Sequence, residues 1–306
     1  MALTLAEAGK LSNDVLLQGV IETIVKNSPI LTRLPFIEIV GNGLTYNREN
    51  ALPTVDFYDV GDNWTESTPT FTQITATLKI MGGDADIDNF ILATRNNIQD
   101  VKTSIVELKS KAIRQKFEEA VIYGDSAVNP KQFNGLKKLI NTATASNQVV
   151  AMGAAGATLT LDKLDMLIDA VKGGKPDILL LSPRSRRKLN SLIRSAGSML
   201  ETDRDNFGIF TQYWNGIPLG INDYILDTHT VAANVETDTV GSTSSTIYAV
   251  QFGEGALCGL TLPGYMSVEP IGSLETKDAT RTRIKWYVSL ALFSSIKAAA
   301  LIGVQD

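Results

Sequence analysis

The chain has 306 residues, of which 44% are hydrophobic and 20% are charged, and its formal net charge is −5. These values are typical of a protein that buries a substantial core, and the acidic balance argues against a nucleic-acid binder with a basic face. No apolar run approaches the ~20 residues that a membrane helix needs, and no signal peptide is evident. The one cysteine, Cys258, excludes an internal disulfide and fits synthesis in a reducing cytosol. The one histidine, His229, excludes most familiar metal and catalytic sets.

The first part of the chain predicts an arm and an extended loop. Residues 2–34 are weakly amphipathic and broken by a proline, so we expect an arm that packs on something else. The segment 36–47 (FIEIVGNGLTYN) predicts a hairpin that turns at Asn42-Gly43. Strict alternation over 72–80 predicts a strand with one wet face. The acidic stretch 53–69 would be the tip of a two-stranded ribbon, which is marginally stable alone and needs a partner surface.

A single long helix is expected over 91–125. Apolar residues recur there in steps of three and four, which lays one stripe along a helix with charged residues on the other faces. The stripe is formed by Ile98, Val101, Ile105, Leu108, Ala112, Ile113, Phe117, Ala120 and Val121. We expect Asp88 and Asn89 to cap its start and Gly124 to end it in the left-handed conformation. At ~1.5 Å rise per residue it would be on the order of 50 Å long.

Residues 150–264 read as a compact lobe in which strands and helices alternate. A helix is expected to begin at Thr160, and a second at Ser182-Pro183, because proline is favoured in the first turn. The uninterrupted apolar run 178–181 predicts a strand covered on both faces.

The end of the chain predicts loops and strands. Residues 228–245 are expected to form a polar loop, and Gly253-Glu254-Gly255 a hairpin turn between two strands. Alternation over 283–290 predicts a strand, and 298–304 is a small-residue apolar end.

No motif in the chain predicts catalysis, and we expect no catalytic, cofactor-binding or metal-binding residues. The acidic segment 84–88 (DADID) resembles the start of a calcium loop but lacks its glycine and final glutamate, so helix capping is favoured. His229 lies in a polar stretch with no partner that the sequence identifies. A basic cluster after Pro183 is interpreted first as a solvated helix face and second as a contact for an acidic partner. The cluster consists of Arg184, Arg186, Arg187, Lys188 and Arg194.

The order of these elements resembles that of tailed-bacteriophage major capsid proteins, whose shell fold encapsulins share. The most specific part is 118–125 (EEAVIYGD), followed by Pro130 and by 133–136 (FNGL), which is similar to the family's helix end and turn. The strand-proline-helix segment 179–183 (LLLSP) and the turn 214–219 (WNGIPL) are also similar to family segments. The resemblance covers nearly the whole chain, and the order of the motifs carries it.

This resemblance implies an α+β fold with five parts. They are an N-terminal arm (1–34), an extended loop and its base (35–90), a peripheral domain with a long spine helix (91–148), an α/β axial domain (149–263), and returning strands of the peripheral domain (264–306). The extended loop would lie over a neighbouring subunit.

The resemblance also implies the function of a major capsid protein in the virion, made in the bacterial host cytoplasm. Copies would assemble as pentamers and hexamers into an icosahedral shell around double-stranded DNA, held by weak non-specific contact. The partners would be the chain itself, separate scaffolding and portal proteins and a decoration protein, with no membrane and no cofactor. No lysine lies between Lys26 and Lys79, so we expect no covalent cross-link through the extended loop. An encapsulin-type cellular shell around a cargo enzyme is the alternative, and an α/β enzyme is a distant one.

We expect contacts between subunits to pair the acidic loop tip of one copy with the basic face of the long helix of another, because such charges fix register. The candidate contact residues are Asp56, Asp59, Asp62, Trp64 and Glu66 on the tip, and Lys102, Lys109, Arg114 and Lys116 on the helix.

Overall fold

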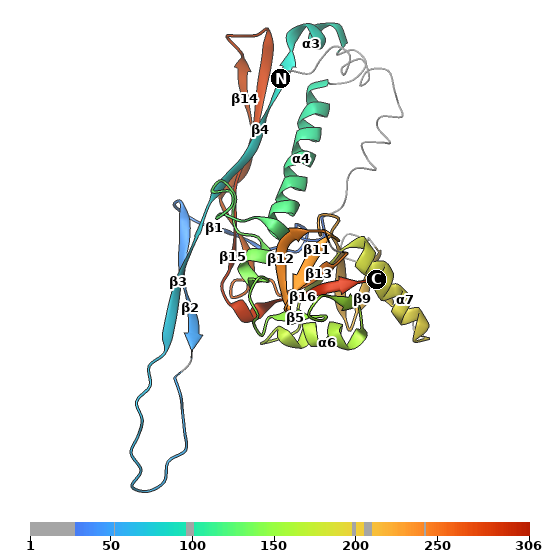
Figure 1. Cartoon of the computed structure of the whole chain (residues 1–306). Coiled ribbons are helices and arrows are strands. Elements are labelled where there is room, and N and C mark those ends of the chain that lie inside the picture. Colours follow the sequence, from blue (N-terminus) through green and yellow to red (C-terminus); the bar gives the residue numbers. More distant parts are fainter. Residues whose placement is uncertain (1–27, 52, 96–100, 198–199, 205–209, 242) are drawn as a thin grey trace.

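The computed structural model describes residues 28–51, 53–95, 101–197, 200–204, 210–241 and 243–306. Two main sheets, several helices and a long two-stranded ribbon make up the molecule (Figure 1). Mixed sheets with separate helices define an α+β fold, as expected from the sequence. The helix α4 (Val101–Tyr123) descends between the upper part of the molecule and the lobe that carries the larger sheet (Figure 1).

The larger sheet lies in the lobe and has eight strands, seven of them in the order β5-β16-β13-β7-β10-β9-β8, with β6 paired to β16. The strands are β5 (Val149–Ala151), β6 (Ala157–Thr158), β7 (Ile178–Leu181), β8 (Glu201–Arg204), β9 (Phe210–Trp214), β10 (Ile217–Ile221), β13 (Ser245–Val250) and β16 (Ala298–Gln305). All four residues of β7 are buried, as its apolar run predicts.

Two helices of the lobe begin where the sequence predicts. In α6 (Leu161–Ala170) Thr160 is the residue before the first turn, and in α7 (Pro183–Ser195) the Ser182 side chain accepts a hydrogen bond from the backbone N–H of Ser185. This cap satisfies one of the backbone donors that the first turn leaves unpaired.

The smaller sheet has four strands in the order β1-β14-β15-β4, and two further strands, β2 and β3, form a separate two-stranded ribbon. The strands are β1 (Phe36–Glu38), β2 (Gly43–Ala51), β3 (Thr70–Thr77), β4 (Lys79–Asp88), β14 (Leu257–Ser273) and β15 (Ala279–Leu292). Alternate residues of β15 from Thr282 to Val288 are buried, as the sequence pattern predicts.

Two predictions about the first 125 residues are wrong. The hairpin expected over 36–47 does not form, because β1 pairs in parallel with β14 while β2 pairs with β3. The single long helix is instead α3 (Asn89–Arg95) and α4, and the residues between them lie outside the described part of the chain. The helix cap expected at Asp88 is present, since Asp88 Oδ1 accepts a hydrogen bond from Phe90 N at 2.8 Å.

Two predictions about the C-terminal half also need correction. The polar loop expected over 228–245 contains the hairpin β11 (His229–Ala232) and β12 (Val235–Val240), whose turn residues Ala233 and Asn234 have positive φ. The turn at 253–255 joins strands of different sheets, β13 and β14, so it is not a hairpin turn.

The last strand, β16, lies in the larger sheet and pairs with β13. The resemblance to the capsid family implies instead that residues 298–304 belong with the returning strands of the peripheral domain. The small residues of β16 explain the difference, because Ala298, Ala299 and Ala300 are fully buried against neighbouring strands.

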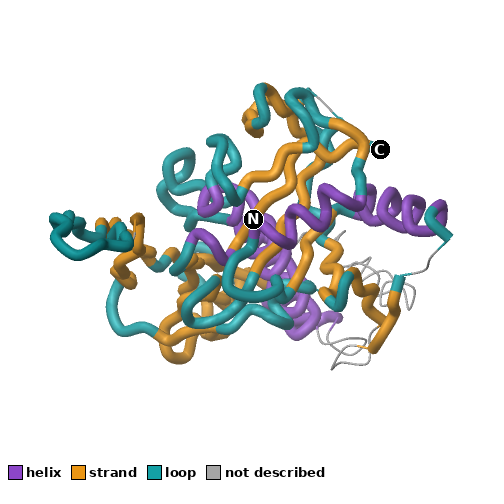
Figure 2. Tube along the Cα trace, turned by 90° about the horizontal axis from the view of Figure 1, so that it is seen from below, coloured by secondary structure: helices purple, strands orange, loops and turns teal. Residues whose placement is uncertain are grey.

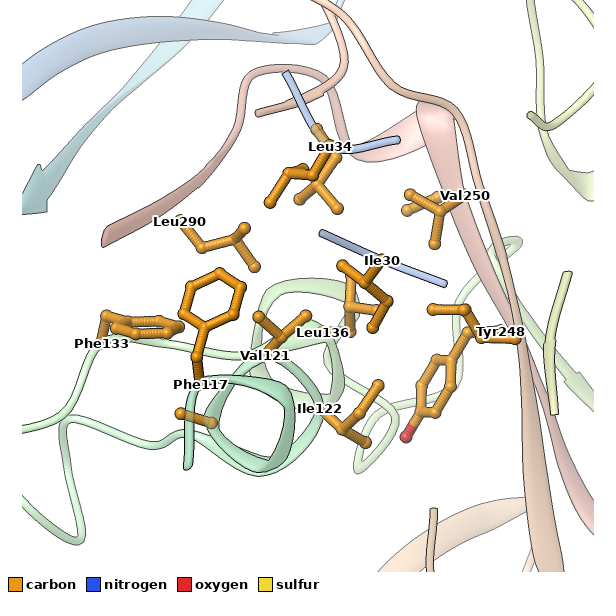
Figure 3. Close-up of a cluster of buried hydrophobic side chains, with 14 of the residues drawn as sticks. Ile30, Leu34, Phe117, Val121, Ile122, Phe133, Leu136, Tyr248, Val250 and Leu290 are labelled. Atoms are coloured by element: carbon orange, nitrogen blue, oxygen red, sulfur yellow. The ribbon is translucent and has the colours of Figure 1, made fainter. Parts of the chain in front are cut away.

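One continuous hydrophobic core joins both sheets to the end of α4. Phe117, Val121 and Ile122 of α4 are fully buried there, together with Leu136 of α5 (Leu136–Ile140). Figure 3 shows these side chains gathered around the helix end with Tyr248 from the larger sheet and Leu290 from the smaller one. Residues of the first described segment, Ile30 and Leu34, complete the cluster.

Gly124 ends α4 by close packing, not by a left-handed conformation as predicted, since its φ is not positive. A Cβ at Gly124 would overlap the backbone oxygen of Phe133 and lie 2.5 Å from the oxygen of Ala120. Gly135 N donates to Gly124 O at 2.7 Å, so the two glycine backbones touch where the chain turns back into α5.

Replacing Gly124 by alanine is expected to lower the free energy of unfolding by about 1–3 kcal/mol, because backbone atoms on both sides cannot move away from the added methyl. Urea unfolding of the unassembled chain measures this change. Gly255→Ala is the matched control, since its Cβ would meet nothing within 4 Å. Equal unfolding midpoints for wild type and Gly124→Ala would contradict the packing argument.

Candidate assembly surfaces

The ribbon β2–β3 and its tip project away from the body of the molecule. Figures 1 and 2 show the tip, residues 53–69, on the opposite side of the molecule from α7. Four large apolar side chains of the tip are almost completely exposed: Val55 (93%), Phe57 (102%), Val60 (102%) and Trp64 (81%). A group of exposed apolar side chains on one segment is typical of an interaction surface.

The tip is locally ordered by its own polar side chains. Asp56 Oδ1 accepts from Phe57 N at 2.9 Å, and Asp62 Oδ2 accepts from Asp59 N at 2.7 Å. Across the loop, Thr54 N donates to Ser67 Oγ at 2.7 Å. The Tyr58 and Trp64 rings stack with centroids 4.4 Å apart. Because these side chains are already ordered, binding of a partner immobilises fewer of them than it would in an unstructured loop. The entropic cost of binding is therefore lower.

The base of the ribbon is anchored on the smaller sheet. Tyr46 packs its ring on Phe293 with centroids 4.7 Å apart, and its hydroxyl donates to Leu292 O at 3.0 Å. Leu44, Ala76 and Leu78 pack on a buried cluster that contains Cys258. Burial raises the pKa of that thiol to about 11, so it stays protonated.

The basic candidates lie on α4, and no described tip residue bonds to them within one chain. Lys116 Nζ is 2.8 Å from Glu119 Oε2 of the same helix. Lys109 lies against Gly83 of β4 and helps to lower the pKa of Asp84. Arg114 is half-buried, and the side chain of Lys102 lies outside the described part of the chain. The structure thus brings the acidic candidates together on the tip and the basic ones together on the helix, but does not bring the two sets into contact.

An ion-pair ladder crosses the outer part of the smaller sheet. Asp86 faces Arg281 and Asp84 faces Arg283 in the register of β4 and β15. Each pair makes two hydrogen bonds, at 2.6 and 2.7 Å for Asp86 and at 2.7 and 2.9 Å for Asp84. The capping role predicted for segment 84–88 therefore holds for Asp88 alone. The guanidinium groups hold the pKa of both carboxyls below the ordinary value.

The basic cluster of α7 is only partly a solvated face. Arg187 is exposed, but Arg184 donates to the backbone oxygens of Thr243 and Asp227 and lies 3.4 Å from the Asp306 carboxylate. Arg184 thus ties the start of α7 to the end of the chain.

Sequence reasoning missed the apolar part of the tip. Val55, Phe57 and Val60 were counted as part of a polar, acidic stretch, although three large apolar residues within six positions of a loop are themselves a signal. Within the described part of the chain, no three His, Cys, Asp or Glu side chains gather closely enough to hold a metal ion. None of the described helices is both long and apolar enough to cross a bilayer.

Comparison with known proteins connects this geometry to shell proteins. The family model described as Major capsid protein GP7 matches residues 12–161, just under half of the chain. No curated protein matches the sequence. Solved structures match over nearly their whole length, which shows that the fold is shared.

Three of these structures illustrate the match. The holo-SrpI encapsulin complex from Synechococcus elongatus PCC 7942 has a TM-score of 0.66 at 18% identity, covering 100% of this chain and 97% of that chain. The capsid of a native GTA particle has a TM-score of 0.64 at 14% identity and 92% coverage of both chains. A structure from Mycobacterium phage Bobi has a TM-score of 0.63 at 15% identity, covering 100% of this chain and 99% of that chain.

The fold is therefore the one that phage capsids and encapsulins build their shells from. The family-model match adds the more particular result: the resemblance to tailed-bacteriophage major capsid proteins is confirmed. Together they support a role in a capsid shell.

The ion-pair ladder predicts a pH-dependent effect for Asp86→Asn. Because the folded pKa of Asp86 lies below its unfolded value, its ionised form stabilises the folded chain above about pH 4, and this contribution is lost as pH falls through the folded value. The loss of stability in Asp86→Asn should be full at pH 7 and shrink below about pH 4.

Urea unfolding at several pH values measures this difference. Asp169→Asn on α6 is the control, because Asp169 is exposed and should show almost no difference at any pH. A loss in Asp86→Asn that stayed constant down to the lowest pH would show that the carboxylate charge is not its cause.

Proposed function

We propose that this chain is the major capsid protein of a tailed bacteriophage, and that its copies assemble as pentamers and hexamers into a closed icosahedral shell around double-stranded DNA. The observation that carries this proposal is the projecting ribbon, whose tip leaves four large apolar side chains uncovered by its own chain. A ribbon on one side of a subunit that binds the next copy makes a head-to-tail contact, and repeated contacts of this kind close into rings.

The proposed domains follow the two sheets. The peripheral domain comprises 91–148 and most of 257–306, because all of β14 (Leu257–Ser273) lies in the smaller sheet. The axial domain comprises 149–256, with β16 added because it lies in the larger sheet. The tip of the extended loop (53–69) reaches a neighbouring copy, whereas Ile30 and Leu34, at the end of the segment expected as an N-terminal arm (1–34), pack in the core of their own chain. The chain acts without a cofactor and is not an enzyme, and scaffolding, portal and decoration functions belong to separate proteins.

The tip contact has two components of different strength. Burying a phenylalanine side chain contributes about 1.5–3 kcal/mol, whereas an exposed ion pair contributes about 0–1 kcal/mol. The affinity of the contact therefore comes from the apolar side chains Phe57, Val60, Val55 and Trp64. The register of the contact is selected by acidic side chains of the tip that face basic ones of a neighbouring α4. The acidic residues are Asp56, Asp59, Asp62 and Glu66, and the basic ones are Lys102, Lys109, Arg114 and Lys116.

The encapsulin match favours a second candidate, a cellular shell around a cargo enzyme. The contents of purified particles separate the two, because a phage capsid packages DNA in the presence of its portal and an encapsulin carries protein cargo. A chain that stayed monomeric at every salt and protein concentration would rule out both, and turnover by that monomer would favour the distant alternative of an enzyme.

Charge reversal tests the register component. The triple change Asp56→Lys, Asp59→Lys and Asp62→Lys should reduce the yield of closed particles at low salt by at least tenfold, counted by negative-stain microscopy and sedimentation. The matched triple change to asparagine keeps a side-chain oxygen for the hydrogen bonds within the tip, so it should assemble better than the lysine variant. Wild-type assembly of the lysine variant at low salt would refute the proposed pairing.

Removal of the apolar side chains tests the affinity component. Phe57→Ser with Val60→Ser should leave the stability of the unassembled chain within about 0.5 kcal/mol of wild type, because both side chains are exposed there. Particle yield should nevertheless fall at least tenfold. Val40→Ser, at an exposed position outside the tip (96%), is the control and should assemble normally. Undiminished assembly of the double variant would exclude these side chains from the contact.

A further inference from the structure

Two helices of the lobe that carries the larger sheet, α6 and α7, present exposed stripes of opposite charge. Each stripe consists of three exposed residues at successive steps of four and three, a spacing that places them on one face of a helix. The acidic stripe of α6 is Asp162, Met166 and Asp169, and the basic stripe of α7 is Arg187, Ser191 and Arg194.

The charges of both stripes are unpaired within one copy. Among the described residues, none of the four charged side chains forms an ion pair. Arg194 Nε donates only to the backbone oxygen of Asn190, at 3.1 Å, so its charge is not neutralised. By contrast, Asp165 beside the acidic stripe already accepts from Trp214 Nε1 at 3.2 Å. The two stripes are therefore available to another molecule.

The stability of the two helices explains only part of this charge. Asp162 lies in the first turn of α6 and Arg194 in the last turn of α7, where the helix dipole favours each of them. Asp169 lies in the last turn of α6, which ends at Ala170, and the dipole disfavours a carboxylate there. Arg187 lies near the start of α7, where a positive charge gains nothing from the dipole. One charge of each stripe thus has no role in its own helix.

Both helices are held rigidly on the larger sheet. Leu164 and Leu167 of α6 and Leu189 and Ile193 of α7 are buried in one cluster with Leu179 of β7. The stripes occupy the sides of the helices that this packing leaves exposed. Figure 1 shows α6 along the lower end of the lobe and α7 on the side away from the ribbon. One copy therefore presents the two charges on different surfaces.

We propose that the basic stripe of one copy docks on the acidic stripe of the next copy, so that neighbouring lobes are joined around each ring. This inference rests on the proposed function and adds a second contact to it. Surfaces that differ but belong to identical copies form a head-to-tail contact, which closes into a ring. Charge complementarity determines which surface of the neighbour is selected.

The spacing of the two stripes supports this pairing. The outer charges of each stripe are seven residues apart, which is roughly 10 Å along a helix axis. Two ion pairs can therefore form together, whether the helices run parallel or antiparallel. Between the charges, Met166 is 49% exposed, and it faces the small side chain of Ser191 at the centre of the other stripe.

Charge reversal of each stripe tests the contact. Asp162→Lys with Asp169→Lys, or Arg187→Glu with Arg194→Glu, places like charges opposite each other. Each double variant should lower the yield of closed particles at low salt by about tenfold, counted by negative-stain microscopy and sedimentation. The four changes together pair the stripes with exchanged signs, so their yield should return to within about threefold of wild type. Double variants that assemble like wild type, or a quadruple variant no better than either of them, would overturn the proposal.

A second quadruple variant separates pairing from net charge. It combines Asp162→Lys and Asp169→Lys with Lys131→Glu and Lys277→Glu, whose side chains are exposed and lie outside α6 and α7. Its net charge equals that of wild type, but its stripes remain alike in sign, so its yield should stay low. A yield restored to that of wild type would show that net charge, and not the contact, determines assembly.

Urea unfolding of the unassembled double variants checks that folding is unaffected. Their midpoints should equal that of wild type, because the side chains are exposed and the dipole favours one change in each helix while it disfavours the other. If a reversed variant does not fold, Asp162→Asn with Asp169→Asn replaces it and should lower the yield by about threefold. An unchanged yield would then overturn the contact. A wild-type chain that forms no particles would instead contradict the proposed function, and this contact with it.

Discussion

The structure depends on the packing of the last turns of α4 between the two sheets. Phe117, Val121 and Ile122 are fully buried in one cluster that includes Trp286 from the smaller sheet and Tyr248 from the larger one. Because one helix end contributes to the cores of both sheets, their relative orientation is determined by side-chain packing rather than by a flexible linker. Large-to-small changes at such positions typically cost about 3–5 kcal/mol for phenylalanine, so this packing is a major part of the total stability.

In the outer part of the smaller sheet, away from this core, few apolar side chains are buried and polar interactions contribute more. Near α3 the buried apolar cluster contains only Ile87 and Ile91 among the described residues. There the ladder of Asp84, Asp86 and their arginines holds β4 to β15. A partly exposed ion pair contributes less than a buried hydrophobic side chain, so these outer parts gain more from contact with another molecule than the core does.

Local patterns in the sequence predicted local structure well. The alternation in β15, the apolar run of β7 and the proline in the first turn of α7 are each local patterns, and the structure agrees with them. The β11–β12 hairpin is a local feature that was missed, but other errors concern interactions between distant segments. Asn42-Gly43 is a strong hairpin signal, but β1 pairs in parallel with β14, more than 200 residues later in the chain, and no local pattern contains that information.

The difference between local patterns and contacts of distant segments also explains which features of the candidate sites the sequence predicts. Gly124 was expected to provide a left-handed φ, whereas its role is to let the backbone at 133–135 approach, which only the fold shows. His229 acquires Tyr123 as a partner across 106 residues. By contrast, the charges of the loop tip were visible in the sequence because the tip is one continuous segment. The apolar residues of the tip are also visible in the sequence, but they are overlooked when the whole loop is described only as acidic.

The tip also shows why charge and apolar area have separate roles in this chain. The carboxylates of Asp56, Asp59 and Asp62 accept hydrogen bonds from backbone N–H groups of the tip. They therefore stabilise the conformation of the tip before any partner binds. Val55, Phe57 and Val60 have no such role, because the folded chain leaves them in water. Exposure of this area is unfavourable for the isolated subunit, and it is relieved only when a partner covers it. The tip is thus better described as an ordered apolar anchor with charged flanks than as an acidic loop.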